Sequence, residues 1–505
     1  MTLDHLLIFA ALAVIGGALL PARARGWLLL VVSVLALYWL QPPTPLRYFD
    51  FWFPTATLAL TVLVWAITQP VPALPARVPA AGAAAGPAKA PVAPANPQRD
   101  TWRTAAVLAA LVLLIALPRY LGPACCLTPD RPPDFVSVML VVAVVAALAG
   151  LLALAHKRLP AAGWLPALGL LGWGGGVALL LALFVILKSE PLGRAAAAVL
   201  RAAAGQSPDL ALASDLRWLG FSYVAFRLIH VLRDRALGRL PNVTLREFVT
   251  YALFFPAFTA GPIDRVERFI KDERAPFKLD SAGLLDGGSR IVLGVLKKFV
   301  LADSLALVAL NAANAEQTHS TLWLWVLVYA YAWRLYLDFS GYTDIAIGLG
   351  RLVGLRLPEN FDRPYTRQNL TLFWNSWHIT LSQWFRAYVF NPLTRALRAR
   401  PLPPAVIILL TQMVVMVLIG LWHGVTWNFV IWGVWHGLGL FVHNRWADYT
   451  KPRAAALDSR PRLKLAAHWL GVVLTFHYVA VGWVWFALPA PGLAWHVLLT
   501  LFGRA

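Results

Sequence analysis

The sequence predicts an all-α polytopic membrane protein with roughly ten to twelve membrane-embedded helices, some of them amphipathic or half-inserted. The first observation is composition: 59% of the 505 residues are hydrophobic and 13% are charged. A soluble domain carries about 25% charged residues, so this chain lacks the polar side chains that would cover a water-soluble surface. The second observation is a succession of apolar runs near the length of about 20 residues that a membrane span requires.

The N-terminal part contains apolar runs near residues 5–22, 26–40, 51–69, 104–121, 135–155 and 161–188. No basic region precedes the first run and no small-residue cleavage site follows it, so we expect a retained span rather than a signal peptide. A Pro/Ala-rich segment near 69–100 separates the third and fourth runs and is typical of a flexible loop. We therefore expect residues 1–190 to form an N-terminal multispan region.

Basic residues outnumber acidic ones by 44 to 24. They fall mostly between apolar runs, as at Arg23–Arg25, His156–Arg158, Arg233–Arg235 and Lys297–Lys298. Cationic loops at the cytoplasmic face explain this placement, which puts the Pro/Ala-rich loop inside and the N-terminus outside. No basic stretch is interleaved with exposed aromatic residues, so we expect no nucleic-acid partner.

The middle of the chain has a different character. Residues 192–239 carry charges too frequently for a simple span, which favours amphipathic or half-inserted helices. Charged or irregular backbone at membrane depth is tolerated only where protein or a water-filled cavity surrounds it. Further spans are expected near 289–310, 320–337, 404–421, 426–443 and 464–487, with a weak one at 491–502.

Several familiar chemistries have no sequence support. The two cysteines, Cys125 and Cys126, are adjacent, which suits neither a disulfide nor a metal site, and we expect no metal. The HExxH, phosphate-loop and nucleophile-elbow motifs do not occur. His423 and His436 would share a helix if that helix were continuous, but a haem would need a second pair of ligands with matching spacing on a facing helix.

Three clusters of polar residues lie within apolar sequence, where each group costs several kcal/mol unless it is satisfied, so they are the functional candidates. The first is Tyr336–Asp344. Asp338 and Asp344 would cap a helix or line a cavity. Alternatively, Ser340–Gly341 breaks one helix and Thr343 or Asp344 starts another. Both interpretations stay open at this point.

The second cluster runs from Pro358 to Arg386. On a helix, a broad aromatic stripe would form from Trp374, Trp377, His378, Trp384 and Phe385. Such a stripe is typical of an interfacial helix with its tryptophans at headgroup level. That interpretation gives no reason for Asn375 and His378 beside the aromatic residues.

The third cluster is Gly420–Phe429, which contains Trp422, His423 and Asn428. A desolvated imidazole stays neutral near pH 7, and only a neutral imidazole accepts a proton as a general base. A lone intramembrane histidine is nevertheless more often structural than catalytic. Glycines at 420 and 424 would admit close approach of a substrate or another helix.

Six ordered motifs resemble those of the membrane-bound O-acyltransferase (MBOAT) family, in the bacterial branch of alginate O-acetyltransferases and the D-alanyl transfer protein of teichoic acid. They are Phe254–Ile263, Gly294–Phe299, Asp338–Asp344, Glu359–Tyr365, Phe373–His378 and Gly420–Gly424. We expect a catalytic core at 191–445, followed by a C-terminal loop and spans at 446–505.

The resemblance implies that His423 is catalytic and that His378 is the second polar position, an Asn or His in that family. It also implies a central tunnel through the membrane, where an acyl thioester meets a hydroxyl. His423 would take the proton of the hydroxyl, and a donor such as His378 or Asn375 would orient the acceptor or stabilise the oxyanion. Substrate binding or tunnel lining is expected of Asn375, Trp374, Trp377, Trp422, Asn428 and Asp338.

The expected function is transfer of an acyl group, in the first place acetyl, to a hydroxyl of an exported polysaccharide or cell-surface glycan in the inner (plasma) membrane. The co-substrate would be acetyl-CoA or an acyl carrier protein on the cytoplasmic side, with no bound cofactor. An extracytoplasmic acyltransferase is a candidate partner. Two alternatives stay open: D-alanyl transfer from a carrier protein to teichoic-acid-like polymers, and non-catalytic transport of acyl groups or lipid-linked sugars.

Overall fold

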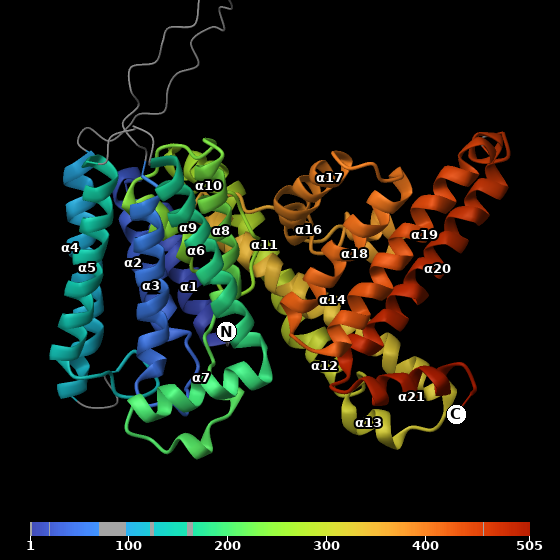
Figure 1. Cartoon of the computed structure of the whole chain (residues 1–505), viewed down its shortest axis with the longest axis horizontal. Coiled ribbons are helices and arrows are strands. Elements are labelled where there is room, and N and C mark those ends of the chain that lie inside the picture. The colour runs from blue at the N-terminus through green and yellow to red at the C-terminus, as the bar shows by residue number, and fades with distance from the viewer. Residues whose placement is uncertain are drawn as a thin grey trace, which may run out of the picture. The chain divides into compact units, whose positions relative to one another are not determined.

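The computed structural model describes residues 3–19, 21–69, 97–121, 126–158, 165–457 and 459–504 (Figure 1). These residues form helices and connecting segments, with no β-strand among them, so the all-α prediction is confirmed. Most of the predicted Pro/Ala-rich loop, residues 70–96, lies outside the described residues. The following helix begins at Pro97, earlier than the apolar run alone indicated.

Within the described ranges, five helices are long and apolar enough to cross a membrane. They are Phe49–Ile67, Gln98–Tyr120, Phe135–Leu154, Pro404–His423 and Pro461–Ala487. A sixth crossing would combine Trp173–Lys188 with Glu190–Ala203, which meet at 98°. The membrane character is therefore confirmed, whereas ten to twelve embedded helices and a central tunnel stay predictions.

The chain divides into two compact units, each of which is described by itself. Unit 1 comprises Met1–Gly287 with Leu349–Leu357, and unit 2 comprises Gly288–Gly348 with Pro358–Ala505. The helices of unit 1 are α1 (Leu3–Leu19), α2 (Ala22–Trp39), α3 (Phe49–Ile67), α4 (Pro97–Ala116), α5 (Phe135–Arg158), α6 (Leu165–Lys188), α7 (Glu190–Ala203), α8 (Phe221–Ala236), α9 (Leu245–Leu253) and α10 (Val266–Arg274). Short 3-10 turns lie at Leu117–Tyr120, Pro208–Leu210 and Ala213–Asp215. The helix α11 (Ser281–Val295) contributes residues to both units.

The helix α7 confirms the prediction of an amphipathic helix after residue 190. Pro191 stands in its first turn, where a proline is tolerated, and would break the helix α6 if that helix continued. The chain therefore bends, and α7 crosses the lower ends of the long helices of unit 1 (Figure 1). Gly193 and Ala197 are buried, and Arg194 and Val199 are exposed.

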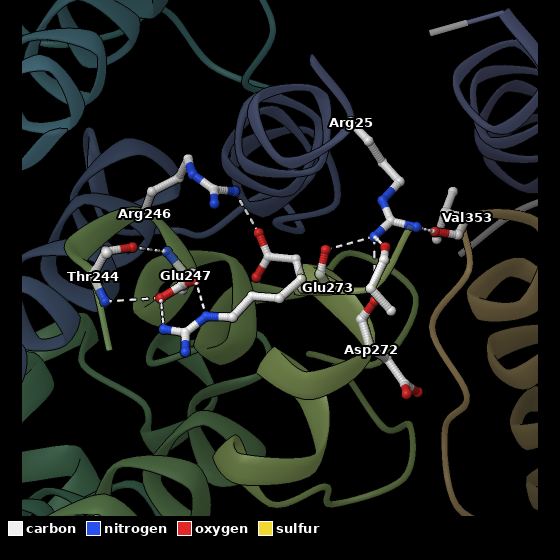
Figure 2. Close-up of polar contacts among 9 residues, drawn as sticks. Arg25, Thr244, Arg246, Glu247, Asp272, Glu273 and Val353 are labelled. Carbon is white, nitrogen blue, oxygen red and sulfur yellow. Dashed lines mark hydrogen bonds and ion pairs between the residues drawn. The ribbon is translucent and has the colours of Figure 1, made fainter. Parts of the chain in front are cut away.

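Arg25 lies inside α2 and is 2% exposed, so the prediction of a cationic loop at this residue is wrong. Its Nη2 donates to the carbonyl oxygens of Glu273 at 2.5 Å, Ala275 at 3.0 Å and Asp272 at 3.2 Å (Figure 2). Its Nη1 donates to the carbonyl of Val353 at 3.4 Å. The last carbonyls of a helix have no intrahelical partner and carry partial negative charge. One buried guanidinium thus caps the C-terminal end of α10.

Ion pairs extend this network from α10 to α9 (Figure 2). Arg246 pairs with the buried Glu273, and Arg274 donates to both carboxylate oxygens of Glu247, at 2.7 and 2.8 Å. Burial opposes the charge of Glu247, but hydrogen bonds from Arg274 and from the backbone N–H of Thr244 outweigh it and lower the pKa of this carboxyl. The two short helices are therefore held by charged hydrogen bonds as well as by apolar packing.

Unit 2 is built on long helices joined by irregular segments. Its helices are α12 (Asp303–Ala306), α13 (Ala312–Gln317), α14 (Thr321–Leu352), α15 (Leu370–Trp374), α16 (Ile379–Phe385), α17 (Asn391–Arg398), α18 (Pro404–His423), α19 (Trp427–Leu457), α20 (Pro461–Ala487) and α21 (Pro491–Leu501). The last turn of α14 belongs to unit 1. Leu296–Ala302 and Arg386–Phe390 are π-helical, and Pro364–Thr366 forms a 3-10 turn.

The helix α14 runs without a break through the first polar cluster, so the alternative in which Ser340–Gly341 separates two helices is wrong. Gly341 instead allows a close crossing. A Cβ on Gly341 would lie 2.8 Å from the carbonyl oxygen of Gly294, and a Cβ on Gly294 would lie 2.6 Å from that of Gly341. No side chain fits between the two backbones.

Cations beside this crossing neutralise the acids of α14. Asp344 is 5% exposed and accepts hydrogen bonds from Arg290 Nε at 2.6 Å and Lys297 Nζ at 2.7 Å. Asp338 pairs with Lys298. The prediction that Lys297–Lys298 forms a loop at the cytoplasmic face is therefore wrong, because both lysines lie in the π-helical segment.

Replacing Arg25 by alanine is expected to lower the free energy of unfolding by about 3 kcal/mol, because several buried carbonyls lose their donor. Thermal and denaturant unfolding of the purified full-length protein measure the change. Arg239→Ala, an exposed arginine of the same unit, is the matched control and is expected to change stability by less than about 0.5 kcal/mol. Equal stability of the two variants would contradict the capping role.

Candidate active site

His423 is the last residue of α18 and is half-buried in an aromatic enclosure. The centroid of its ring lies 4.5 Å from that of Trp422, 4.6 Å from Phe486, 5.8 Å from Trp432 and 5.9 Å from Phe429. The imidazole is therefore at a helix end rather than inside a helix, and is less buried than the apolar sequence around it indicated.

Two glycines permit the close approach of Phe429 that completes this enclosure, and the sequence indicated that they would admit such close approach. A Cβ on Gly420 would lie 2.2 Å from the carbonyl oxygen of Phe429, and a Cβ on Gly424 would lie 2.7 Å from its ring. The turn from α18 to α19 consequently folds tightly onto the end of α18. This close approach sets Phe429 against His423.

His378 lies in the turn between α15 and α16 and is 2% exposed. Its backbone is left-handed, with φ +43° and ψ +55°, which is uncommon for any residue but glycine. Neither ring nitrogen has a hydrogen-bond partner among the described residues. The ring centroid lies 4.7 Å from that of Phe339 and 5.9 Å from that of Trp422.

The predicted aromatic stripe on one helix is wrong, because α15 ends at Trp374 and α16 begins at Ile379. Asn360, which is fully buried, holds the chain in the intervening turn. Its carbonyl accepts from Ile379 N at 2.9 Å, and its Oδ1 accepts from Thr380 N at 3.2 Å and Thr380 Oγ1 at 2.6 Å. Sequence reasoning missed Asn360 as a residue that positions His378.

Trp422 joins the two predicted catalytic residues. Its indole contacts the ring of His378 on one side and that of His423 on the other, at centroid distances of 5.9 and 4.5 Å. The structure thus brings together three of the predicted site residues, although 45 positions of sequence separate the histidines (423 − 378). The arrangement therefore places two imidazoles against one indole within an aromatic cluster.

A third imidazole, that of His436, adjoins this aromatic cluster. His436 is fully buried on α19, and neither ring nitrogen has a hydrogen-bond partner in the described part of the chain. Its ring lies 5.2 Å from Trp374 and 4.9 Å from Trp432, and Trp432 also contacts His423. His423 and His436 lie on different helices, so the arrangement considered for haem does not occur. From the sequence, His436 was expected only as a candidate haem ligand.

Trp377 belongs to an adjacent aromatic group. Its ring contacts those of Tyr336, Phe361, Tyr365, Phe373 and Trp483, at 5.1 to 6.3 Å. Trp483 stacks on Trp432 at 5.8 Å. Trp377 is therefore linked to the enclosure of His423 through Trp483 and Trp432.

The remaining predicted site residues form hydrogen bonds or ion pairs with residues outside the aromatic enclosure. Asn375 is exposed and accepts a hydrogen bond from Arg386 at 2.7 Å. Asn428 is 2% exposed and donates to the carbonyl of Leu488 at 2.6 Å, which ties α19 to the end of α20. The side chain of Asp338 is 49% exposed and pairs with Lys298. These bonds give each residue a local structural role.

One group of side chains in the described residues has spacing compatible with a metal ion, namely His230, Asp234 and Glu267 in unit 1. His230 Nδ1 lies 3.2 Å from Asp234 Oδ2, and His230 Nε2 accepts from the backbone N–H of Val266 at 3.4 Å. Nε2 thus joins α8 to α10, whereas Nδ1 faces Asp234 one turn farther along α8. The group belongs to unit 1, whereas the predicted catalytic histidines belong to unit 2.

Residues 205–479 match the model of the MBOAT, membrane-bound O-acyltransferase family, and this range includes all the predicted site residues. The teichoic acid D-alanyltransferase of Streptococcus thermophilus is 33% identical over 291 residues, which cover 54% of this chain and 69% of that protein.

Two further relatives carry acetyl-transferase names. The probable alginate O-acetylase AlgI of Azotobacter vinelandii is 36% identical over 56% of this chain and 53% of its own length. The peptidoglycan O-acetyltransferase of Helicobacter pylori is 34% identical over 48% of this chain and 44% of its own length. The chain thus spans about half the length of these two relatives.

The left-handed backbone at His378 gives a stability prediction. His378→Gly and His378→Ala both remove the imidazole, but only glycine adopts this φ without strain, so the glycine variant is expected to be more stable by about 1 kcal/mol. Thermal unfolding of both purified variants measures the difference. An ordinary helical position would show the reverse order, and that order would contradict the assigned turn.

Proposed function

The chain belongs to the membrane-bound O-acyltransferase family, and on this premise we propose that it transfers an acyl group from a thioester donor to a hydroxyl of a cell-envelope polymer. The observation that carries the proposal is the convergence of His378 and His423 on the indole of Trp422. The family relationship supports the reaction class. The names of the relatives, which specify teichoic acid, alginate and peptidoglycan, support a polymer of this kind as acceptor.

In the proposed reaction His423 is the general base. A neutral imidazole takes the proton of the acceptor hydroxyl while the oxygen attacks the thioester carbonyl carbon. The new C–O bond forms, the C–S bond breaks, and the leaving thiolate recovers the proton from the imidazolium. No acyl-enzyme is required. The half-buried helix-end position of His423 suits this role, because a base must be both desolvated and reachable.

His378 is proposed to stabilise the oxyanion or to orient the acceptor. Its ring nitrogens are buried and have no partner among the described residues, so one N–H is available to a substrate oxygen. A donor fixed before the reaction needs no reorganisation as charge develops. The left-handed turn held by Asn360 supplies this fixed position.

The aromatic residues are proposed to exclude water from the thioester. Trp422, Phe429, Trp432 and Phe486 contact the ring of His423, and an apolar wall both limits hydrolysis and strengthens local electrostatic interactions. Trp374 and Trp377 would continue this wall as tunnel lining. Asn428 is proposed to position α19 against the end of α20, whereas the exposed Asn375 and Asp338 suit a position at the mouth of the proposed tunnel.

We propose an inner (plasma) membrane location, with acetyl-CoA or an acyl carrier protein as the co-substrate on the cytoplasmic side. A glycan, or an extracytoplasmic acyltransferase that passes the group on, would be the acceptor. The acetyl-transferase names of two relatives favour acetyl transfer. D-alanyl transfer is the second candidate, because the Streptococcus thermophilus transferase matches over more of its own length.

His423→Ala is expected to lower acyl transfer at least about 100-fold, because proton removal from the hydroxyl loses its base. Transfer of radiolabel from acetyl-CoA to polymer in membranes containing the full-length protein measures the rate. A D-alanyl carrier-protein thioester, run in parallel, distinguishes the two donors. His496→Ala, an exposed histidine on α21, is the matched control and is expected to keep full activity.

Folding of the His423→Ala variant is verified by monodisperse elution and by an unfolding temperature close to that of the unmodified protein. A folded variant that retains transfer within about threefold would eliminate the general-base assignment. Transport of acyl groups that survives loss of both His378 and His423 would favour the non-catalytic transporter instead.

A further inference from the structure

Unit 1 contains an apolar cavity of about 620 Å³ that the acyl-transfer proposal does not use. Side chains from α3, α5, α6 and α7 line it, together with Leu216 and Trp218. Thr55 is the one hydroxyl residue in the lining, and its Oγ1 already donates to the carbonyl of Phe51 at 2.8 Å. The indole N–H of Trp218 donates to Thr57 at 2.7 Å. The lining therefore suits a hydrocarbon rather than a sugar or a thioester.

The length of the cavity matches one leaflet of a bilayer. The lining residues of α3 run from Phe49 to Ala59, which corresponds to about 15 Å of helix at about 1.5 Å per residue. Half of a hydrocarbon core of about 30 Å is the same length. The cavity thus begins at the end of a membrane-spanning helix and extends to about the depth of a lipid chain.

The helix α7 marks the membrane interface at this end of the cavity. It lies at 98° to α6 and crosses the ends of the neighbouring helices (Figure 1). Leu192 and Val199 on α7 are 47% and 69% exposed, while Arg194 is also exposed. Exposed apolar and basic side chains on one helix are typical of a helix lying in the headgroup region.

Basic side chains adjoin the lining residues at this end. Lys188 follows the lining residue Leu187, and Arg217 lies between Leu216 and Trp218. Arg47 is exposed just before α3, and its backbone N–H donates to Gln206 beyond α7 at 2.9 Å.

Acidic groups offset this charge only in part. Asp215 is fully buried and pairs with Arg201 at 2.7 Å, so it does not neutralise the exposed cations. The exposed acids at this end of unit 1 are Asp130, Asp134, Glu190 and Asp209. Six cations outnumber them, namely Arg47, Arg119, Arg131, Lys188, Arg194 and Arg217.

We propose that this cavity holds one acyl chain of an anionic phospholipid, whose phosphate lies among these cations. The hydrocarbon lining, the leaflet-length depth and the positive rim each match one part of such a lipid. The inference is independent of acyl transfer, since it concerns unit 1 and its readout is lipid binding.

Native mass spectrometry of the full-length protein, titrated with phosphatidylglycerol or phosphatidylcholine, tests the proposal. Ala59→Phe and Ala196→Phe each place a ring in the cavity and are expected to weaken retention of one phosphatidylglycerol at least about tenfold. Ala147→Phe on the exposed side of α5 is the matched control and is expected to bind normally. Equal loss in the control, or unchanged binding in both cavity variants with folding verified by monodisperse elution, would overturn the assignment.

The contribution of the basic residues to phospholipid binding is tested separately. Arg47→Gln and Arg217→Gln are each expected to lower phosphatidylglycerol binding about fivefold and to leave phosphatidylcholine binding unchanged. Equal affinity of the unmodified protein for the two lipids would overturn the anionic headgroup. Retention of a polyprenyl phosphate in place of a phospholipid, in protein purified from native membranes, would overturn the lipid class.

Discussion

Backbone groups at helix ends inside an apolar interior must find hydrogen-bond partners, and much of this structure depends on that constraint. In unit 1, the guanidinium of Arg25 satisfies the carbonyls at the end of α10. In unit 2, Asn360 satisfies the N–H groups at the turn that carries His378. Irregular backbone can therefore lie among apolar helices, and it holds His378 where a regular helix would point that side chain elsewhere.

The sequence predicted those parts of the fold that depend on local composition. The apolar runs correspond closely to α3, α5, α18 and α20, because hydropathy over about 20 residues is a local property. The sequence did not predict that Arg25 is buried at the end of α10, because its hydrogen-bond partner Glu273 is 248 residues away. The role of Gly341 was also ambiguous from the sequence. Only the close crossing with Gly294 shows that Gly341 permits backbone packing and does not break the helix.

The residues of the candidate site likewise fall into those that local sequence identified and those that it did not. His378, Trp422 and His423 were identifiable because each is an unusual residue within apolar sequence, and the structure places their rings in contact. Asn360 and His436 were missed as site residues because their surroundings come from segments distant in sequence. The single-helix stripe failed because no local pattern signals a left-handed residue at position 378.

That left-handed backbone also bears on which residues can occupy position 378 in evolution. Asparagine, aspartate and histidine adopt this conformation several times more often than other residues with a side chain. The resemblance described for this position allows Asn or His, which are also the two of these types that offer a neutral N–H donor. Backbone geometry and chemistry therefore select the same small set of side chains. A mutational survey is expected to reject an apolar or β-branched residue here because of the backbone conformation, and under the proposed oxyanion role also because the donor is lost.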